Sequence, residues 1–138
     1  TQLLIEISAG SGNVMGDTFE ELAYIVNKDK RVGVCIDSAH MFGSGYDIKT
    51  EEGFKKTVSV IKKTIGLSSI KLIHSNDSKV DLASHKDRHD HIGHGKIGKD
   101  GFKFLMKTFP KLDFILETEH DKVKEDIKTL KNIRKALG

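Results

Sequence analysis

The sequence predicts an α/β fold made of four consecutive βα units. Two observations lead to this prediction: short apolar runs of strand length recur along the 138 residues, and each is followed by a segment whose apolar residues have helical spacing. Continuous apolar strands that alternate with helices are typical of a parallel sheet covered by helices. Two architectures fit this order, a small doubly wound sheet and half of a (βα)8 barrel, whose complete form needs about 250 residues.

The first unit starts with the apolar run Leu3 to Ile7 and, after a glycine-rich turn, continues with a helix over residues 18–26. Apolar residues in this helix fall at positions i, i+3, i+4 and i+7: Phe19, Leu22, Ala23 and Val26. The second unit has a strand over 32–36, a loop at 43–45, and a helix that Gly66 closes as its C-cap. Four apolar residues define this helix: Phe54, Val58, Ile61 and Ile65.

The third unit has a strand over 70–73, a long polar segment over 75–99 and a helix near 102–106. The fourth has a strand over 112–116 and a helix over about 123–137. The apolar residues of this last helix again have helical spacing: Val123, Ile127, Leu130 and Ile133.

Composition indicates a single globular domain. Hydrophobic residues make up 37% and charged residues 31% of the chain, as in soluble proteins, and no linker or repeat divides residues 1–138. No apolar run approaches the roughly 20 residues of a membrane helix, so we expect no membrane contact. The one cysteine, Cys35, lies in an apolar run, so we expect a buried thiol. A single cysteine cannot form a disulfide within the chain, and we expect an intracellular location, in cytoplasm, nucleoid or nucleus. The net charge of +3 permits a polyanionic partner without requiring one.

Each predicted strand ends at a side chain that can bind a metal ion: Glu6, Asp37, His74 and Glu117. In parallel α/β folds, the carboxyl ends of the strands and the loops after them form the active-site face. A charged residue at one strand end is unremarkable, because every strand must reach water. Four such residues at four strand ends predict a functional site at this face.

Two further pairs of residues extend this set. Asp37 and His40 form D-x-x-H directly after the second strand, and Asp87 and His89 form D-x-H in the long polar segment. Residues two apart in an extended segment point the same way, so Asp87 and His89 can bind one ion. Carboxylate and imidazole together suit zinc, manganese or iron rather than calcium. The pairs therefore favour a site with several metal ions, as in enzymes that displace phosphoryl groups.

The segment from Asp87 to Gly98 carries basic side chains, among them Arg88 and Lys96, between three glycines, and could cradle phosphates. The glycine-rich stretch from Ala9 to Asn13 lacks the third glycine of a dinucleotide fingerprint and fits a tight turn. Four other histidines are expected at the surface or as supporting donors rather than as ligands: His85, His91, His94 and His120.

These segments resemble the endonuclease IV family of abasic-site DNA repair enzymes. Leu4-Ile5-Glu6 with Ala9-Gly10-Ser11-Gly12 is similar to the L-x-E-x-x-A-G-x-G segment of that family, and Ile115-Leu116-Glu117-Thr118 resembles its closing L-E-T. The block from Gly33 to His40, with Phe42 and Gly45-Tyr46-Asp47, resembles G-x-C-x-D-x-x-H-x-F-x-x-G-Y-D. A third stretch is similar to the H-x-N-D-S-K, D-R-H and I-G-x-G-x-I-G run: His74 to Lys79, Asp87-Arg88-His89 and Ile92 to Gly98.

The resemblance implies two or three zinc ions, with manganese as the alternative, on a barrel of the xylose isomerase-like type. Glu6 would bridge two metals, and three further residues would bind one of those two: Asp37, His74 and Glu117. A third metal would be held by His40, Asp87 and His89. Glu117 and Glu6 would be the catalytic residues in hydrolysis of the phosphodiester 5′ to an abasic site in double-stranded DNA. Four residues would contact the DNA: Gly10, Gly12, Arg88 and Lys96.

The sequence departs from the family pattern in three places. Glu119 stands where the family usually has proline after L-E-T, Ile7-Ser8 follows Glu6 in place of the common Asn-Thr, and His94 is an unusual residue at the x position of I-G-x-G. The first half of the family's barrel is absent, with two histidines that complete one metal site and the loop that enters the minor groove. We therefore expect a half barrel from a longer chain, which pairs with the missing half or with a second copy of itself.

Two other functions remain open from the sequence. One is a sugar isomerase or epimerase of the related xylose isomerase-like barrel, which places similar ligands at its strand ends. The D-R-H and I-G-x-G-x-I-G segments and the additional D-x-x-H argue against it. The other is a non-catalytic remnant that binds metal or DNA, and activity on abasic-site DNA distinguishes it from the enzyme.

Overall fold

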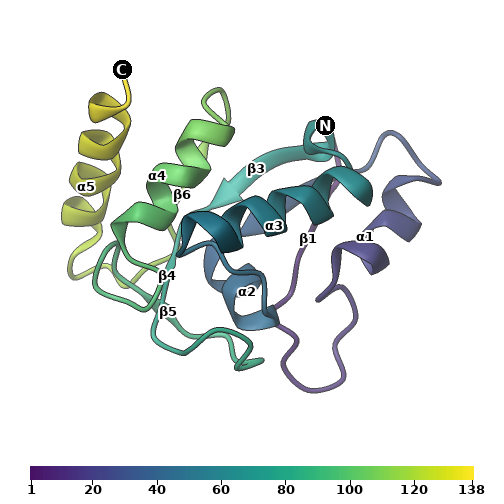
Figure 1. Cartoon of the computed structure of the whole chain (residues 1–138), viewed down its shortest axis with the longest axis horizontal. Helices are drawn as coiled ribbons and strands as arrows, with labels where there is room; N and C mark the ends of the chain where they lie inside the picture. Colours follow the sequence, from purple (N-terminus) through teal and green to yellow (C-terminus); the bar gives the residue numbers. More distant parts are fainter.

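The computed structural model describes residues 1–138 and contains a four-stranded parallel sheet (Figure 1). Its strands lie in the order β1 (Leu4–Glu6), β2 (Gly33–Asp37), β3 (Ile70–His74) and β6 (Phe114–Ile115). Neighbouring strands follow one another in sequence, so every connection crosses in the same direction. A doubly wound sheet would instead reverse its strand order near the middle. The expected parallel sheet of four βα units is confirmed, and the order favours a barrel segment.

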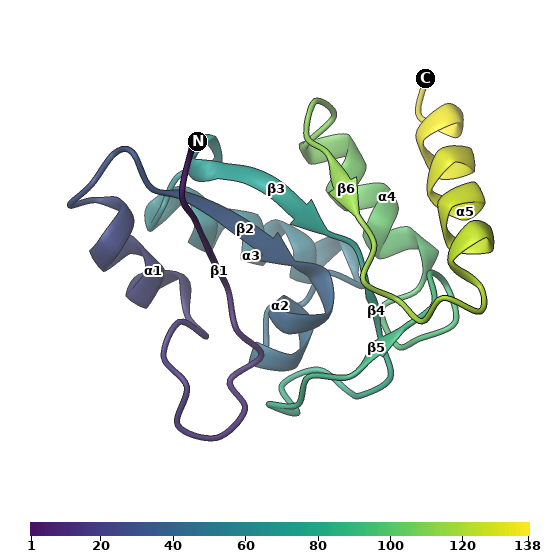
Figure 2. The same ribbon diagram turned by 180° about the vertical axis from the view of Figure 1, so that it is seen from behind.

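A helix follows each strand of this sheet. These helices are α1 (Phe19–Val26), α3 (Glu51–Lys63), α4 (Lys99–Thr108) and α5 (Val123–Ala136), and Figure 2 shows the strands in front of α3. The first two begin at threonine N-caps, because the hydroxyl of Thr18 accepts the N–H of Glu21 and that of Thr50 accepts the N–H of Gly53. The local sequence thus fixes where α1 and α3 start.

The prediction of a loop at 43–45 is wrong, because Ser38–Ser44 form a short helix, α2. The carboxylate of Asp37 accepts the N–H of His40 at 2.9 Å and caps the first turn. Gly45, with φ of 106°, ends the helix in the left-handed conformation that glycine favours. Both signals were legible in the sequence, but seven residues without a clear apolar stripe do not show helical periodicity.

Two further details differ from expectation. The polar segment 75–99 contains an antiparallel pair of short strands, β4 (Asp77–Ser78) and β5 (His89–Asp90). The prediction that Gly66 is the C-cap of α3 is wrong, because Thr64 occupies that position. Gly66 lies two residues further along with φ of 74°, and its N–H donates to the carbonyl of Ile61 at 2.8 Å. A short 3-10 turn, Leu67–Ser69, then leads into β3.

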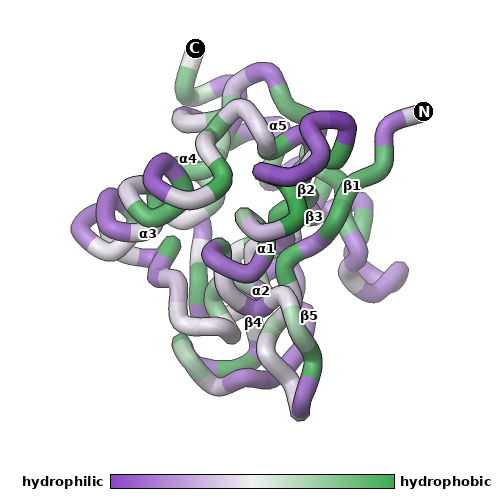
Figure 3. Tube along the Cα trace, turned by 90° about the vertical axis from the view of Figure 1, so that its right-hand side faces the viewer, coloured by the Kyte–Doolittle hydropathy of each residue, from purple (hydrophilic) through white to green (hydrophobic).

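The hydrophobic core lies between the sheet and its helices. It contains 21 buried residues, and three of those with no exposed surface are Phe19, Ile36 and Phe102. Figure 3 shows hydrophobic segments gathered along β1 and β2. Cys35 is buried in β2, as expected. None of the helices is both long and apolar enough to cross a membrane.

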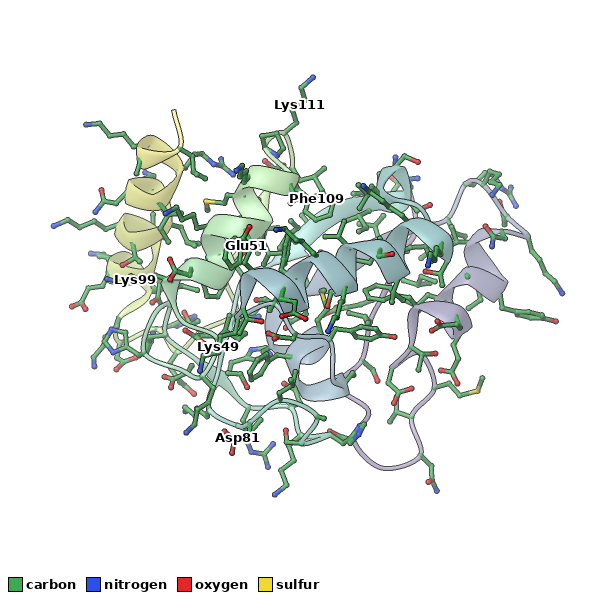
Figure 4. All side chains as sticks on the ribbon, viewed as in Figure 1. Lys49, Glu51, Asp81, Lys99, Phe109 and Lys111 are labelled. Carbon is green, nitrogen blue, oxygen red and sulfur yellow. The ribbon has the colours of Figure 1, made fainter.

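The carboxyl ends of the strands, α2 and the β4–β5 hairpin share one end of the molecule. Figure 4 places Asp81, in the hairpin connection, at this end and Lys111, in the turn before β6, at the opposite end. The sheet also has two open edges, since β1 pairs with β2 alone and β6 with β3 alone. A partly apolar groove runs between β6 and α5, and Ile115 and Ile127 lining it are 46% and 41% exposed.

Replacing Phe102 by alanine is expected to lower the free energy of unfolding by about 3–5 kcal/mol, because the ring is fully buried and leaves a cavity. Phe104→Ala is the matched control on the same helix, since its ring is only partly buried and stacks on Phe54 with centroids 5.5 Å apart. Urea unfolding followed by circular dichroism measures both. Equal losses for the two variants would contradict this view of the core.

Candidate metal centre

The four predicted strand-end residues meet at one point of the sheet edge. One ligand atom from each lies within 4.8 Å of the others in the group Glu6, Asp37, His74 and Glu117. The Nδ1 atom of His74 is 3.1 Å from Glu6 Oε1 and 3.1 Å from Glu117 Oε2. One imidazole nitrogen therefore lies between two carboxylates from the two outer strands.

A second group lies beside the first and shares one residue with it. Ligand atoms of Asp37, His40 and His89 lie within 4.8 Å of one another. The carboxylate of Asp87 spans both imidazoles, with Oδ2 at 3.0 Å from His40 Nε2 and Oδ1 at 3.1 Å from His89 Nε2. Asp37 connects the groups, because its Oδ2 atom is 3.6 Å from His89 Nε2.

The orientation of the two rings indicates which nitrogen is free. His40 Nδ1 is 2.9 Å from the carbonyl of Ile7, and His89 Nδ1 is 3.3 Å from the carbonyl of Glu117. A carbonyl only accepts, so Nδ1 carries a proton in both rings, and Nε2 is the nitrogen that offers a lone pair whenever the ring is neutral. This is the arrangement of histidines that bind metals, whose second nitrogen donates to a carbonyl or carboxylate.

Both Nε2 atoms are buried and make no hydrogen bond, although carboxylate oxygens lie 3.0–3.1 Å away. Two buried nitrogens without partners are costly unless another group satisfies them. Four carboxylates converge here, from Glu6, Asp37, Asp87 and Glu117, and none pairs with a lysine or arginine. The two unsatisfied Nε2 atoms and the four carboxylates together fit metal cations.

Local structure places each of these side chains. Asp37 caps α2 through one carboxylate oxygen, and this puts His40 in the first turn of that helix, above the end of β2. The hairpin pairs Ser78 with His89, so the segment that carries His89 runs back beside the end of β3. Asp87 lies just before this paired segment, with its side chain half exposed.

The charges of the site affect two titrating groups. Burial of the His40 ring lowers its pKa, but Asp37, the hydrogen bond to the Ile7 carbonyl, Asp87 and Glu6 outweigh this, so the pKa lies above its ordinary value. Burial raises the pKa of the Cys35 thiol to about 12, and the charge of Glu6 adds to the effect. Cys35 also lies within ligand distance of Glu6 and His74. A protonated, buried thiol is a poor ligand, so the carboxylates and imidazoles are the better candidates.

Asn76 belongs to the site, although the sequence pattern did not assign it a role. Its side-chain N–H donates to Asp37 Oδ2 at 2.7 Å and to Glu117 Oε2 at 3.4 Å, and its oxygen accepts the N–H of Glu117 at 2.8 Å. The residue has no exposed surface. It therefore holds two candidate ligands from different strands. Its position two residues after His74 was the available signal.

The four residues predicted to contact DNA lie near this end of the molecule without forming one cluster. Arg88 is exposed and donates to the carbonyl of Asp87 at 2.6 Å, and Lys96 is exposed with Nζ 3.8 Å from Asp81. Gly10 and Gly12 have φ of 72° and 68°. A Cβ on Gly10 would lie 2.6 Å from Asp17 Oδ2 and 2.7 Å from His85 Nδ1, whereas one on Gly12 would meet open space.

Among the four histidines not expected as ligands, His85, His94 and His120 are exposed. His91 is instead held between two aspartates: its Nδ1 atom is 2.7 Å from Asp126 and its Nε2 atom is 3.0 Å from Asp121. None of the four lies in either ligand group.

Comparison with known proteins gives consistent matches. The family described as xylose isomerase-like TIM barrel matches residues 1–136. The apurinic-apyrimidinic endonuclease of Caenorhabditis elegans is 44% identical over an alignment of 138 positions that covers 96% of this chain and 35% of that protein. The probable endonuclease 4 of Aquifex aeolicus is 46% identical over an alignment of 122 positions that covers 86% of this chain and 43% of that protein.

A solved structure has the same fold over nearly the whole chain. Endonuclease IV from Thermus thermophilus superposes with a TM-score of 0.83 at 35% identity, covering 98% of this chain and 49% of that one. This chain therefore spans between about a third and a half of the length of the relatives that it matches.

Proposed function

Because the chain belongs to the xylose isomerase-like TIM barrel family, we propose that it supplies the C-terminal half of a metal-dependent endonuclease that hydrolyses DNA 5′ to abasic sites. The observation that carries the proposal is the pair of adjoining ligand groups joined through Asp37, with two buried imidazole nitrogens that no hydrogen bond satisfies. The relative from Caenorhabditis elegans, named as an apurinic-apyrimidinic endonuclease, supports the choice of substrate.

Zinc fits the proposed ligand sets best, because tetrahedral sites built from imidazole and carboxylate suit this ion, with manganese as the alternative. One ion would be held by Glu6, Asp37, His74 and Glu117. Glu6 would also bind a second ion, whose other ligands would come from outside this chain. His40, Asp87 and His89 would hold a third. When bound, such ions lower the pKa of water and stabilise charge on phosphoryl oxygens.

The protein groups prepare the site for a phosphodiester. Glu6 and Glu117, the proposed catalytic carboxylates, lie on either side of His74, and Asn76 fixes Glu117 through its main-chain N–H and its carboxylate. Arg88 lies next to Asp87 and offers an exposed cation to a phosphate, as Lys96 does from the neighbouring loop. Gly12 keeps the loop after β1 open where a DNA backbone would approach, since a Cβ there would meet no other atom. Gly10, also proposed to contact DNA, is required by the turn itself, because a Cβ there would meet Asp17 and His85.

The rest of the site is proposed to come from a second half barrel. The main sheet has four strands, and its open edges at β1 and β6 would pair with four more strands, from a longer form of this chain, another polypeptide or a second copy. The complete barrel would bind double-stranded DNA inside the cell.

Metal content and DNA nicking, measured on the same purified sample, test this function. We expect two or more zinc ions per barrel by plasma emission, and incision 5′ to an abasic site that leaves a 3′-hydroxyl and stops after chelation. Undamaged duplex is the matched control substrate. Conversion of an aldose to a ketose by the metal-loaded protein would identify an isomerase instead. Absence of both metal and nicking would overturn the proposal.

A further inference from the structure

A buried polar cluster lies outside the two ligand groups, at the start of α5. Its centre is Asp126, which is 2% exposed. Asp126 Oδ1 accepts the main-chain N–H of Ile92 at 2.8 Å. Asp126 Oδ2 accepts the hydroxyl of Thr118 at 2.6 Å and lies 2.7 Å from His91 Nδ1. A buried carboxylate needs such donors on both oxygens, and here three groups provide them.

The cluster joins two segments that carry candidate ligands. Thr118 directly follows Glu117, and His91 and Ile92 lie two and three residues after His89. The same segments touch once more at the site, where His89 Nδ1 is 3.3 Å from the carbonyl of Glu117. The segment after β6 and the segment after β5 are thus fixed to each other at two points, one inside the metal centre and one behind it.

The contact at the metal centre is the weaker of the two. At 3.3 Å it lies beyond the usual length of a hydrogen bond from nitrogen to oxygen, whereas the bonds to Asp126 are all 2.6–2.8 Å. Bonds to a charged acceptor are also stronger than those between neutral groups. The cluster behind the site is therefore the stronger connection between the segments of Glu117 and His89.

We propose that Asp126 is a positioning residue for metal binding, which sets the separation of Glu117 and His89 by holding Thr118, His91 and Ile92. This inference rests on the proposed metal-dependent function. Asp126 touches neither ligand and acts through the two segments. His91 has a second carboxylate partner, Asp121, but that side chain is 64% exposed and bonds neither Thr118 nor Ile92.

Metal affinity tests the proposal without any need for activity. The variants are Asp126→Ala, which removes all three bonds, and Thr118→Val, which removes one bond and keeps the shape of the side chain. Asp121→Asn is the matched control, because it alters the exposed partner of the same histidine. Zinc affinity is measured by competition with a chelator, and the absorption of bound Co²⁺ reports the ligand geometry.

We expect Asp126→Ala to weaken metal binding by about 10- to 100-fold, the usual effect of losing a group that orients metal ligands, and to change the Co²⁺ spectrum. Thr118→Val should move affinity in the same direction by a smaller factor, and Asp121→Asn should stay within about twofold of the parent chain. If Asp126→Ala does not fold, Thr118→Val decides alone, with an unchanged affinity and spectrum counting against the proposal.

The possible results separate this inference from the proposed function. A lower melting temperature with unchanged affinity and an unchanged Co²⁺ spectrum would give Asp126 a purely structural role and overturn the inference alone. An equal loss of affinity in Asp121→Asn would also overturn it, because the exposed partner would then matter as much. A parent chain that binds neither zinc nor Co²⁺ would overturn the proposed function, and this inference with it.

Discussion

A Glu117→Gln variant is expected to lose cleavage of abasic-site DNA by roughly 10²- to 10⁴-fold while it stays folded. Glutamine keeps the size of the side chain but removes the negative charge that faces His74 Nδ1 at 3.1 Å. It also replaces one carboxylate oxygen by an NH2 group. If that group takes the place of Glu117 Oε2, it faces the side-chain N–H of Asn76, and two donors then meet. The side chain is 43% exposed and outside the hydrophobic core, so the fold should not depend on it.

Glu119→Gln is the control for this prediction. Glu119 lies two residues further along, is exposed and forms no ion pair, so its variant should cleave at the parent rate. Single-turnover nicking of an oligonucleotide with one abasic site measures both variants, and circular dichroism confirms that they are folded. Unchanged turnover in Glu117→Gln would remove this carboxylate from the mechanism.

Replacing either His40 or His89 by alanine is expected to remove one metal ion per chain and to weaken binding at that position by at least about 100-fold. Each ring offers its buried Nε2 atom beside Asp87 at 3.0 or 3.1 Å, and a site with three protein ligands does not tolerate the loss of one. The ion held by the strand-end group should remain, since Glu6, His74 and Glu117 are unchanged. Plasma emission after dialysis gives the count.

His94→Ala is the matched control for the histidine variants, because its imidazole is exposed and belongs to neither ligand group. It should retain the full number of ions. Loss of every ion in His40→Ala would show that the two groups do not bind independently. An unchanged count in both His40→Ala and His89→Ala would exclude the second group as a metal site.

The strand-end residues could be predicted from the sequence because two simple rules locate them. Apolar runs show where parallel strands lie, and parallel strands bring their carboxyl ends to one edge. Glu6, Asp37 and His74 are the last residues of β1, β2 and β3, and Glu117 follows β6 by two residues. The sequence therefore predicted which side chains meet, although not the atoms through which they meet.

The roles of Asn76 and Asp126 could not be derived in this way. Each joins segments that are far apart along the chain, 41 residues between Asn76 and Glu117 and 34 between Asp126 and Ile92. Such bonds depend on the final distances between strand ends, which periodicity does not contain. The pairing of β4 with β5 was missed for a related reason: two-residue strands are too short to show alternation.

The sequential order of the strands has a consequence for how such a barrel can be divided. A polypeptide that completed a barrel would meet this chain along two seams, beside β1 and beside β6, and would pair there through main-chain N–H and C=O groups. Main-chain complementarity is indifferent to most side-chain substitutions, so the two halves can diverge in sequence and still fit together. Genetic fusion, fission or exchange of halves would then leave the main-chain pairing along the seams intact, provided that each half still contributed its own ligands.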